Sequence, residues 1–300
     1  MELFNQIIVK AMPLIPKPII RRVAMKYIAG YELKDAIRVT QEFMTQGGWT
    51  TIDVLGEFVD NKKMAIAATE ESSKVIDAIY KNKLITYLSI KPTSQGLGID
   101  FDFAYENIKK LVAKALSKGL WIRIDMENSP YTDKTLDLYR KLRADGFENV
   151  GIVLQAYMRR SIDDVKSLVD LKPSIRLCKG IYREAESIAY QGKEEVRDNY
   201  KKLFNLIVEN DMYIGIATHD EPLINYAEEY IAKSNLAKEK YEFQMLLGVR
   251  EQKRDELLGN GHHLRIYVPY GEDWYGYSTR RLKENPNMAG HIFKAMFSSK

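Results

Sequence analysis

The residues with the most specific chemistry lie close together near the C-terminal end of the 300-residue chain. A helix that begins at about residue 275 would place Tyr277 one turn from both Arg280 and Arg281. Glu284 would lie one turn beyond the two arginines. Adjacent arginines beside a tyrosine offer bidentate donors for a carboxylate in an aromatic-walled pocket. An exposed helix with ordinary arginine–glutamate pairs fits the same spacing equally well.

A second group of polar residues follows short apolar runs along the chain. Taken singly, each residue fits a solvated loop position or a local ion pair, but their shared placement after successive strands favours a functional site. The group consists of Glu57, Lys91, Asp125, Glu127, Gln155, Tyr157, Lys179, Tyr182, Thr218, His219, Asp220, Tyr267 and Tyr270.

Arg176 differs from this group because it lies inside an apolar run, SIRLCKG. A buried guanidinium needs a carboxylate, a phosphate or an electron-rich ligand to offset its desolvation. An inward-facing ion pair with Asp125 or Glu127 is the structural alternative. The neighbouring Cys178 is interpreted as a small buried side chain, since no cysteine–histidine signature surrounds it.

The sequence predicts no catalytic metal. The chain has one cysteine and four histidines. His262 and His263 are adjacent and would point to opposite sides of a strand, and no HExxH motif occurs. Nucleic acid is also an unsuitable partner, because no dense basic patch is interleaved with aromatic residues.

Eight apolar runs alternate with stretches of helical period, which is typical of a parallel α/β sheet whose faces are covered by helices. Eight such units in roughly 250 residues match the usual extent of a (β/α)8 TIM-type barrel. A doubly wound sheet is the alternative, but the glycine pair at 96–98 lacks the third glycine of a dinucleotide fingerprint. The predicted strands are residues 49–57, 84–91, 120–127, 150–157, 174–180, 212–219, 241–248 and 263–271.

Two regions are expected: an N-terminal helical segment over residues 1–46 that packs on the barrel, and the barrel itself over 47–300. Three prolines interrupt the N-terminal segment, and no apolar run approaches membrane-spanning length. The net charge of +4 is compatible with an anionic membrane surface but does not require one. The expected location is cytoplasmic, with a peripheral contact at the inner face of the membrane left open.

Taken in chain order, the motifs resemble the proline dehydrogenase family, in particular its short bacterial monofunctional members. The match extends from about Trp49 to Pro286, and the order of its motifs makes it much stronger than any single one. The motifs are TIDVLGE, SIKPTSQG, IDMEN, VGIVLQAY, RLCKGIYRE, IATHDE, EFQMLLGVR and YVPYGEDWYGYSTRRLKENP. The resemblance implies a distorted barrel whose final helix lies over the strand ends, with noncovalent FAD beneath this helix and L-proline between flavin and helix.

The resemblance also implies roles on the substrate side. Arg280 and Arg281 match the arginines that hold the proline carboxylate, and Lys91 matches the lysine that assists them. Asp125 matches an acidic group that orients this basic cluster, and Glu57 matches a residue that pairs with the first arginine. Tyr267, Tyr277 and Leu246 would pack on the pyrrolidine ring, and Glu284 continues the polar face of the helix.

On the cofactor side, Arg176 resembles an arginine near flavin N5, where positive charge stabilises the reduced flavin. Arg183 stands where some relatives carry tryptophan, which leaves contacts to the adenine or ribose open. The remaining positions that match the FAD site are Gln155, Cys178, Lys179, Gly180, Ile181, Tyr182, Thr218 and His219.

The reaction implied is hydride transfer from proline to FAD, which gives Δ1-pyrroline-5-carboxylate, with the electrons then passed to a membrane quinone. Two alternatives stay open on the residues alone. One is a lyase or aldolase-type barrel in which Lys91 or Lys179 forms a Schiff base. The other is a barrel retained as a non-catalytic binding module.

Overall fold

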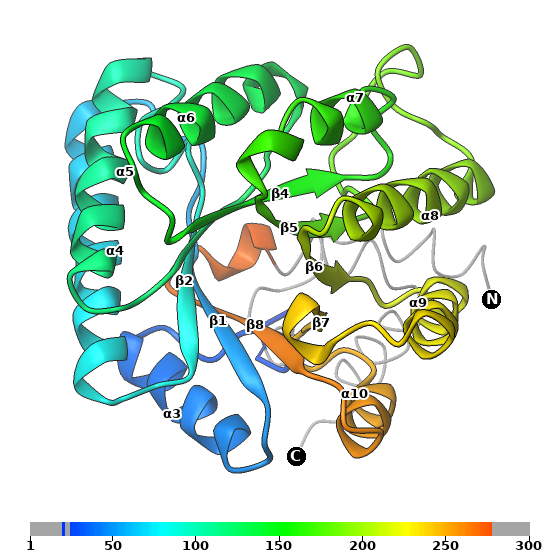
Figure 1. Cartoon of the computed structure of the whole chain (residues 1–300). Helices are drawn as coiled ribbons and strands as arrows, with labels where there is room; N and C mark the ends of the chain where they lie inside the picture. Colours follow the sequence, from blue (N-terminus) through cyan, green and yellow to red (C-terminus); the bar gives the residue numbers. More distant parts are fainter. Residues whose placement is uncertain (1–19, 22–24, 278–300) are drawn as a thin grey trace.

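Eight parallel strands close into a barrel in chain order, with β8 pairing back onto β1 (Figure 1). This closed barrel confirms the predicted (β/α)8 fold. The computed structural model describes residues 20, 21 and 25–277. The strands are β1 (Trp49–Val54), β2 (Thr86–Ile90), β3 (Ile122–Ile124), β4 (Val150–Gln155), β5 (Ser174–Cys178), β6 (Tyr213–Ala217), β7 (Tyr241–Leu246) and β8 (Leu264–Tyr270).

The helices between the strands bury one apolar face against the barrel. In α5, Ile108, Leu111 and Val112 are fully buried, and the Asp100 carboxylate caps the first turn by accepting from Phe103 N at 2.7 Å. The connecting helices are α4 (Lys62–Lys81), α5 (Phe101–Leu116), α6 (Thr132–Ala144), α7 (Ser161–Lys166), α8 (Lys193–Glu209), α9 (Glu221–Ser234) and α10 (Glu251–Gly259). Short 3-10 turns lie at Ser129–Tyr131, Val169–Leu171 and Lys238–Lys240.

The helix α3 (Leu33–Met44) precedes the barrel and packs against both β1 and β8. It fills the part of the wall that a helix following β8 would otherwise cover (Figure 1). A buried hydrogen bond of 3.1 Å between the hydroxyls of Thr50 and Thr40 joins β1 to this helix. The division of the chain at residue 46 stays a prediction.

After β8 the chain turns across the carboxyl ends of the strands. The carboxylate of Asp273 lies 3.4 Å from the position that a Cβ atom on Gly56 would take, next to the end of β1. A helical turn covers residues 274–277. The predicted final helix therefore begins at this rim, but Arg280, Arg281 and Glu284 lie outside the described residues.

The interior of the barrel contains charged side chains as well as apolar ones. Arg265 donates to both oxygens of Glu242, at 2.8 and 2.9 Å, and its guanidinium lies 4.1 Å from the ring centre of Tyr87. Arg123 donates to the carbonyl of Ile152 at 3.1 Å. A Cβ atom on Gly151 would lie 2.4 Å from the Arg123 guanidinium, so only glycine leaves room there.

Among the described residues, no helix is both long and apolar enough to cross a membrane, and no group of three potential ligands could hold a metal ion.

Candidate active site

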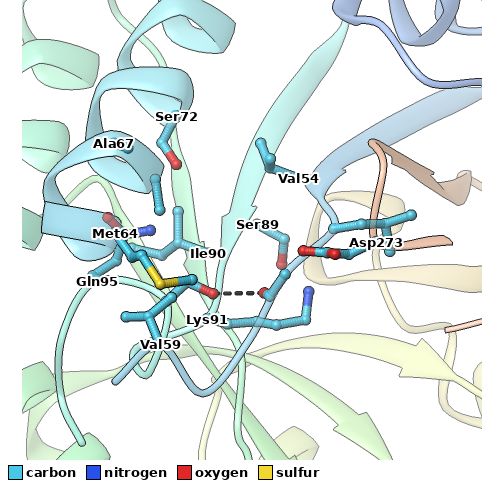
Figure 2. Close-up of a pocket in the computed structure, with 14 residues that line it drawn as sticks. Val54, Val59, Met64, Ala67, Ser72, Ser89, Ile90, Lys91, Gln95 and Asp273 are labelled. Atoms are coloured by element: carbon cyan, nitrogen blue, oxygen red, sulfur yellow. Dashed lines mark hydrogen bonds between the residues drawn. The ribbon is translucent and has the colours of Figure 1, made fainter. Parts of the chain in front are cut away.

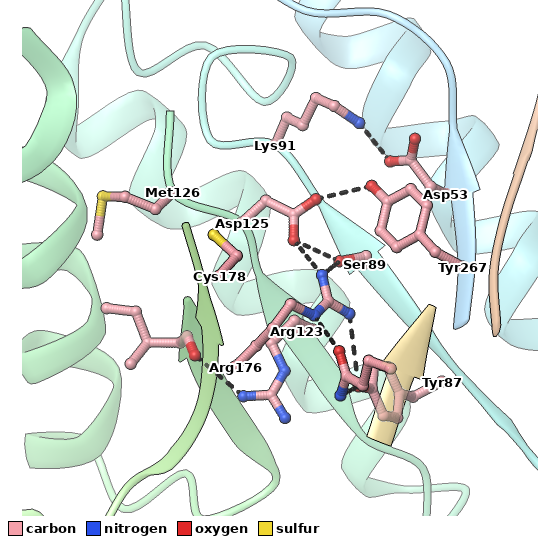
Figure 3. A network of polar contacts seen from close by, with 12 residues as sticks. Asp53, Tyr87, Ser89, Lys91, Arg123, Asp125, Met126, Arg176, Cys178 and Tyr267 are labelled. Carbon is pink, nitrogen blue, oxygen red and sulfur yellow. Dashed lines mark hydrogen bonds and ion pairs between the residues drawn. The ribbon is translucent and has the colours of Figure 1, made fainter. Parts of the chain in front are cut away.

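The carboxylate of Asp125 lies at the centre of a polar network that joins four strands (Figure 3). Its Oδ1 atom accepts from Ser89 Oγ and from the Arg176 guanidinium, each at 2.7 Å. Its Oδ2 atom accepts from the Tyr267 hydroxyl at 2.8 Å. Asp125 directly follows β3, Ser89 is in β2, Arg176 in β5 and Tyr267 in β8. The closed barrel thus brings together side chains that are distant in the sequence, such as Asp125 and Tyr267, which are 142 positions apart.

Arg176 is a buried cation with partners on three sides. Its Nε atom donates to Gln244 Oε1 at 2.6 Å, and its guanidinium lies 5.2 Å from the ring centre of Tyr267. Burial opposes the charge, but Tyr87 and Asp125 more than offset it and raise the arginine pKa above its ordinary value. The ion pair with Asp125 that the sequence suggested as one alternative is present. This pair also fixes the position of the Arg176 guanidinium inside the barrel.

Lys91 forms a short hydrogen-bonded ion pair with the buried Asp53 of β1. Burial lowers the lysine pKa, but the charges of Asp53 and Asp125 outweigh this effect and raise it above its ordinary value. Burial also raises the pKa of Asp53 to about 6, against the opposing effect of Lys91. Both groups therefore carry charge at neutral pH. A protonated amine is a poor nucleophile, which argues against a Schiff base at Lys91.

A cavity of about 240 Å³ opens beside Lys91, between the ends of β1 and β2 and the start of α4 (Figure 2). Asp273, on the segment that follows β8, lies at its edge. Its walls combine apolar and polar side chains, a composition that suits a small amphipathic ligand. The wall residues include Val54, Val59, Met64, Ala67, Ile90 and Gln95.

A second buried carboxylate, Glu127, lies near this cavity. Its Oε2 atom accepts from the backbone N–H of Thr93 at 2.8 Å, and its Oε1 atom accepts from the Thr93 hydroxyl. Burial raises the pKa of Glu127 to about 7, although both contacts with Thr93 oppose the shift. The same hydroxyl accepts from Phe58 N at 2.9 Å and so fixes the loop that contains Glu57.

The predicted cofactor positions line the ends of β4 and β5. Gln155 donates to the carbonyl of Met126 at 3.1 Å, while its buried Oε1 atom has no hydrogen-bond partner among the described residues. Gly180 has φ +108°, and a Cβ atom there would lie 2.1 Å from the Tyr157 ring. Ile181 is exposed at this rim, next to Tyr182. Burial raises the pKa of the Cys178 thiol to about 11, so the thiol stays protonated at neutral pH.

His219 connects the predicted cofactor and substrate positions. Its Nε2 atom accepts from the backbone N–H of Leu246 at 2.9 Å, which requires the tautomer that carries its proton on Nδ1. Thr218 accepts from Asp220 N at 3.1 Å and so fixes the turn after β6. Leu246, at the end of β7, is thereby linked to the same turn.

Three predicted rim positions, Lys179, Asp220 and Tyr270, belong to other clusters. Lys179 pairs with Asp220 at 2.8 Å, and Arg197 pairs with the same carboxylate at 2.7 Å. Tyr270 points out of the barrel towards α4, where its hydroxyl donates to Glu71 at 2.8 Å. These residues therefore lie apart from the Asp125 network.

The sequence analysis did not single out four residues of this region: Asp53, Tyr87, Ser89 and Gln244. The signal used for Arg176, a polar residue inside an apolar strand, applies equally to Asp53 in TIDV and to Gln244 in EFQML. Ser89 carries no such signal, because a buried serine in a strand is common.

Known proteins of one family match this chain along most of its length. The model of the family "Proline dehydrogenase" matches residues 36–293. The chain is 40% identical to proline dehydrogenase 2 of Bacillus subtilis (strain 168) over 276 residues, which covers 92% of this chain and 91% of that protein. It is 36% identical to the proline dehydrogenase of Deinococcus radiodurans over 277 residues, or 91% of this chain and 89% of that one.

Among solved structures, the chain is similar to proline utilization A (PutA) from Corynebacterium freiburgense, with a TM-score of 0.76 at 25% identity. That match covers 99% of this chain and 34% of the other. PutA from Bdellovibrio bacteriovorus superposes with a TM-score of 0.84 at 24% identity, over 93% of this chain and 34% of that one, and shows the shared fold. The chain thus spans about a third of these larger proteins. A match over most of its length to the family model and to short relatives of similar size means that the chain belongs to the proline dehydrogenase family.

Proposed function

We propose that the protein, an oxidoreductase that acts on proline, transfers a hydride from L-proline to bound FAD and releases Δ1-pyrroline-5-carboxylate. This oxidation is the first step of proline catabolism. The carbon next to the ring nitrogen loses the hydride and the nitrogen loses a proton, so that a C=N bond forms. The observation that supports this function best is the buried Arg176–Asp125 pair at the mouth of a barrel of this family.

FAD is the cofactor that we propose, and it supplies the hydride-accepting ring. Three features of the chain fit a flavin at the ends of β4 and β5. The Oε1 atom of Gln155 is a buried acceptor that a ring N–H can satisfy. A side chain at position 180 would collide with Tyr157, so Gly180 keeps the backbone there accessible. Arg176 provides positive charge that favours the reduced, more anionic flavin. The other proposed contacts are Cys178, Lys179, Ile181, Tyr182, Thr218 and His219.

On the substrate side, we propose that Arg280, Arg281 and Lys91 bind the proline carboxylate. The charged state of Lys91 suits this role. Asp125 fixes the Tyr267 hydroxyl and so the orientation of its ring, which packs on the pyrrolidine with Tyr277 and Leu246. Glu57 pairs with the first arginine, and Glu284 continues the polar face of the final helix.

Positioning, rather than strong acid–base catalysis, supplies much of the rate in this proposal. The proline amine reacts in its neutral form, because a positive nitrogen opposes the developing iminium. Catalytic efficiency should therefore rise towards alkaline pH as the amine deprotonates.

We propose that a membrane quinone receives the electrons and that the barrel rim approaches the membrane peripherally. Four large apolar side chains are exposed on loops or first turns that follow barrel strands: Phe58, Met64, Ile181 and Ile188. Exposed apolar groups of this kind partition into the membrane interface. The protein should float together with vesicles in a density gradient, and replacement of Phe58 and Ile188 by serine should reduce this binding.

Three measurements test the central proposal. The purified protein should show flavin absorption, and proline should bleach this absorption under anaerobic conditions. The chromophore released on denaturation should chromatograph as FAD. Covalent trapping of the substrate by borohydride would instead indicate a Schiff-base lyase. A colourless, inactive protein would indicate a binding module.

The carboxylate clamp is tested with pyrrolidine, which lacks the carboxylate. Arg281→Met should slow flavin reduction by proline by one to several orders of magnitude, because loss of one partner of a desolvated ion pair costs about 2–5 kcal/mol. Reduction by pyrrolidine should change far less. Equal losses for both substrates would assign the arginines a structural role.

A further inference from the structure

We propose that the segment Met25–Tyr31, here called the N-terminal strap, positions the substrate side of the active site. The strap contacts two loops, one that follows β7 and one that follows β8. The first loop continues from Leu246, and the second leads to Tyr277. The proposed function packs both of these side chains on the pyrrolidine ring. The inference rests on the proposed function for the roles of these two residues.

The strap continues the hydrogen bonding of β8 where β7 ends. The last pairing between β7 and β8 is Leu246 with Tyr267, whose carbonyl accepts from Leu247 N at 3.1 Å. Further along the same edge of β8, the carbonyl of Pro269 accepts from Ala29 N at 2.8 Å. Gly271 N then donates to the carbonyl of Gly30 at 3.1 Å. The strap therefore fixes the exit of β8, from which the chain runs to Tyr277.

The loop after β7 is held by a close backbone contact. Gly248 has φ +73°, and a Cβ atom there would lie 2.0 Å from the carbonyl oxygen of Lys26 and 3.4 Å from the Tyr27 ring. No side-chain rotation can relieve a collision with a backbone oxygen. The contact therefore requires glycine at this position, two residues after Leu246.

An apolar cluster joins the strap to the final turn of helix. Tyr27 and Ile28 are buried with Leu55, at the end of β1, and with Tyr277, which is only 6% exposed. Val249, on the loop after β7, and Trp274 pack against the same cluster. Tyr277 thus takes its position from strap residues and not from the barrel strands alone.

This arrangement matters for catalysis because the reaction depends on position. A displacement of about 1 Å at a reacting group can cost about a hundredfold in rate, even when the mutation is remote. The strap does not contact the Arg176–Asp125 pair or the Gln155 side chain in any described hydrogen bond. Loosening it should therefore slow flavin reduction by proline and weaken proline binding, while flavin binding is unchanged.

The experiment uses the flavin-loaded, full-length protein and the variant Gly248→Ala. Rapid mixing with proline under anaerobic conditions gives the apparent dissociation constant of proline and the limiting rate of flavin reduction. The limiting rate of flavin reduction should fall about ten- to a hundredfold, and the apparent dissociation constant of proline should rise. Flavin content and the visible spectrum should match the wild type, and hydrogen exchange in peptides over residues 264–277 should increase.

Gly119→Ala is a matched control. Gly119 also has a positive φ, +67°, but a Cβ atom there meets nothing within 4 Å, so the variant has similar backbone strain without the collision. It should bind proline like the wild type. Tyr27→Ala tests the strap without a change in the β7 loop, and Tyr27→Phe, which keeps the ring, should restore wild-type binding.

The outcomes separate the two proposals. If proline reduces the wild type, and both Gly248→Ala and Tyr27→Ala bind proline and are reduced by it like the wild type, the strap has no positioning role. A loss that only parallels a loss of flavin or a lower melting temperature, or a loss of the same size in Gly119→Ala, contradicts the positioning role as well. A wild-type protein that proline does not reduce contradicts the proposed function itself.

Discussion

Arg176 and Asp125 form the charge pair on which the other side chains of the proposed site converge. Asp125 receives hydrogen bonds from a serine, an arginine and a tyrosine, and so leaves neither oxygen without a partner. Arg176 is likewise enclosed by Gln244 and Tyr267. Both groups are therefore held in place before any ligand binds, which is the property that a site working by electrostatic preorganisation needs.

Arg176→Met should lower the reduction potential of the bound flavin. A hydrogen bond to a charged group contributes about 1.5–3 kcal/mol. For a two-electron couple, a loss of this size corresponds to a fall of about 30–65 mV. The potential is measured by equilibration with reference dyes.

Arg123→Met is the control for this prediction. Arg123 is equally buried, but it is paired with Gly151 on β4 whereas Arg176 is paired with Val153, two residues nearer the carboxyl end. This variant should lose stability and keep the wild-type potential. An unchanged potential and flavin affinity in Arg176→Met would assign Arg176 to barrel stability alone.

Glu127 should make the stability of the protein depend on pH. The pKa of Glu127 is about 7 in the folded protein and 4.5 in the unfolded chain, so the carboxyl group keeps its proton to a higher pH in the folded state. The favourable contribution is complete below pH 4.5 and is lost as the pH rises through about 7. The loss amounts to roughly 3 kcal/mol, at about 1.4 kcal/mol for each pKa unit.

Glu127→Gln removes this titration and keeps both contacts with Thr93, since an amide can accept from the backbone N–H and donate to the hydroxyl. Urea unfolding of both proteins from pH 4.5 to 8.5 gives the difference in the free energy of unfolding. The wild type should lose stability relative to the variant across this range. A constant difference would show that Glu127 titrates normally.

At the scale of the elements, the buried ion pair between Glu242 of β7 and Arg265 of β8 should couple the two strands strongly. Either Glu242→Leu or Arg265→Met leaves one buried charge without its partner, which costs about 3–5 kcal/mol in the free energy of unfolding. The double variant should cost much less than the sum. Urea unfolding of the four proteins measures the coupling energy.

The exposed pair of Lys233 and Glu229 on α9 is the matched control. Its atoms are 3.5 Å apart, and the side chains are 80% and 68% exposed. Its coupling should be below about 1 kcal/mol. A similarly small value for Glu242 and Arg265 would mean that water or another group screens the buried pair.

The sequence predicted all eight strands because each is a short, mostly buried run that alternates with a helical stretch, but it placed their ends too far along the chain. The predicted run 120–127 contains β3, which covers only Ile122–Ile124. Asp125 and Glu127 follow this strand, and their carboxylates accept hydrogen bonds from the Tyr267 hydroxyl and from Thr93 N.

The partners inside the site were harder to predict than its members. Lys91 and Asp125 were recognised at the strand ends, yet Asp53 was not, since its pairing with Lys91 depends on the register between β1 and β2. Periodicity identifies a strand and its buried faces. It does not say which inward side chain of one strand meets which side chain of another.

At the scale of the whole molecule, bound FAD should raise the melting temperature. A ligand at a hundred times its dissociation constant adds about 2.7 kcal/mol. For a chain of 300 residues that corresponds to an increase of about 4 °C. Protein stripped of flavin and then reconstituted should show this increase by scanning calorimetry.

FMN is the control ligand, because it has the same ring and lacks the adenosine part. Contacts beyond the ring, among which Thr218 and His219 are proposed, should make FMN the weaker stabiliser. Equal shifts with FMN and FAD would mean that the adenosine part contributes no binding energy, and the assignment of FAD would fail.

The closure of the barrel by α3 and β8 also has a consequence during synthesis on the ribosome. β1 pairs with β8 from Trp49 with Arg265 to Val54 with Tyr270, and α3 packs on both strands. At about 5–20 residues per second, β8 emerges some 10–40 seconds after β1. Throughout that interval one edge of β1 and the apolar face of α3 lack their final partner. The nascent chain therefore exposes an unpaired strand edge and an apolar helix face, the two features that make folding intermediates prone to aggregation.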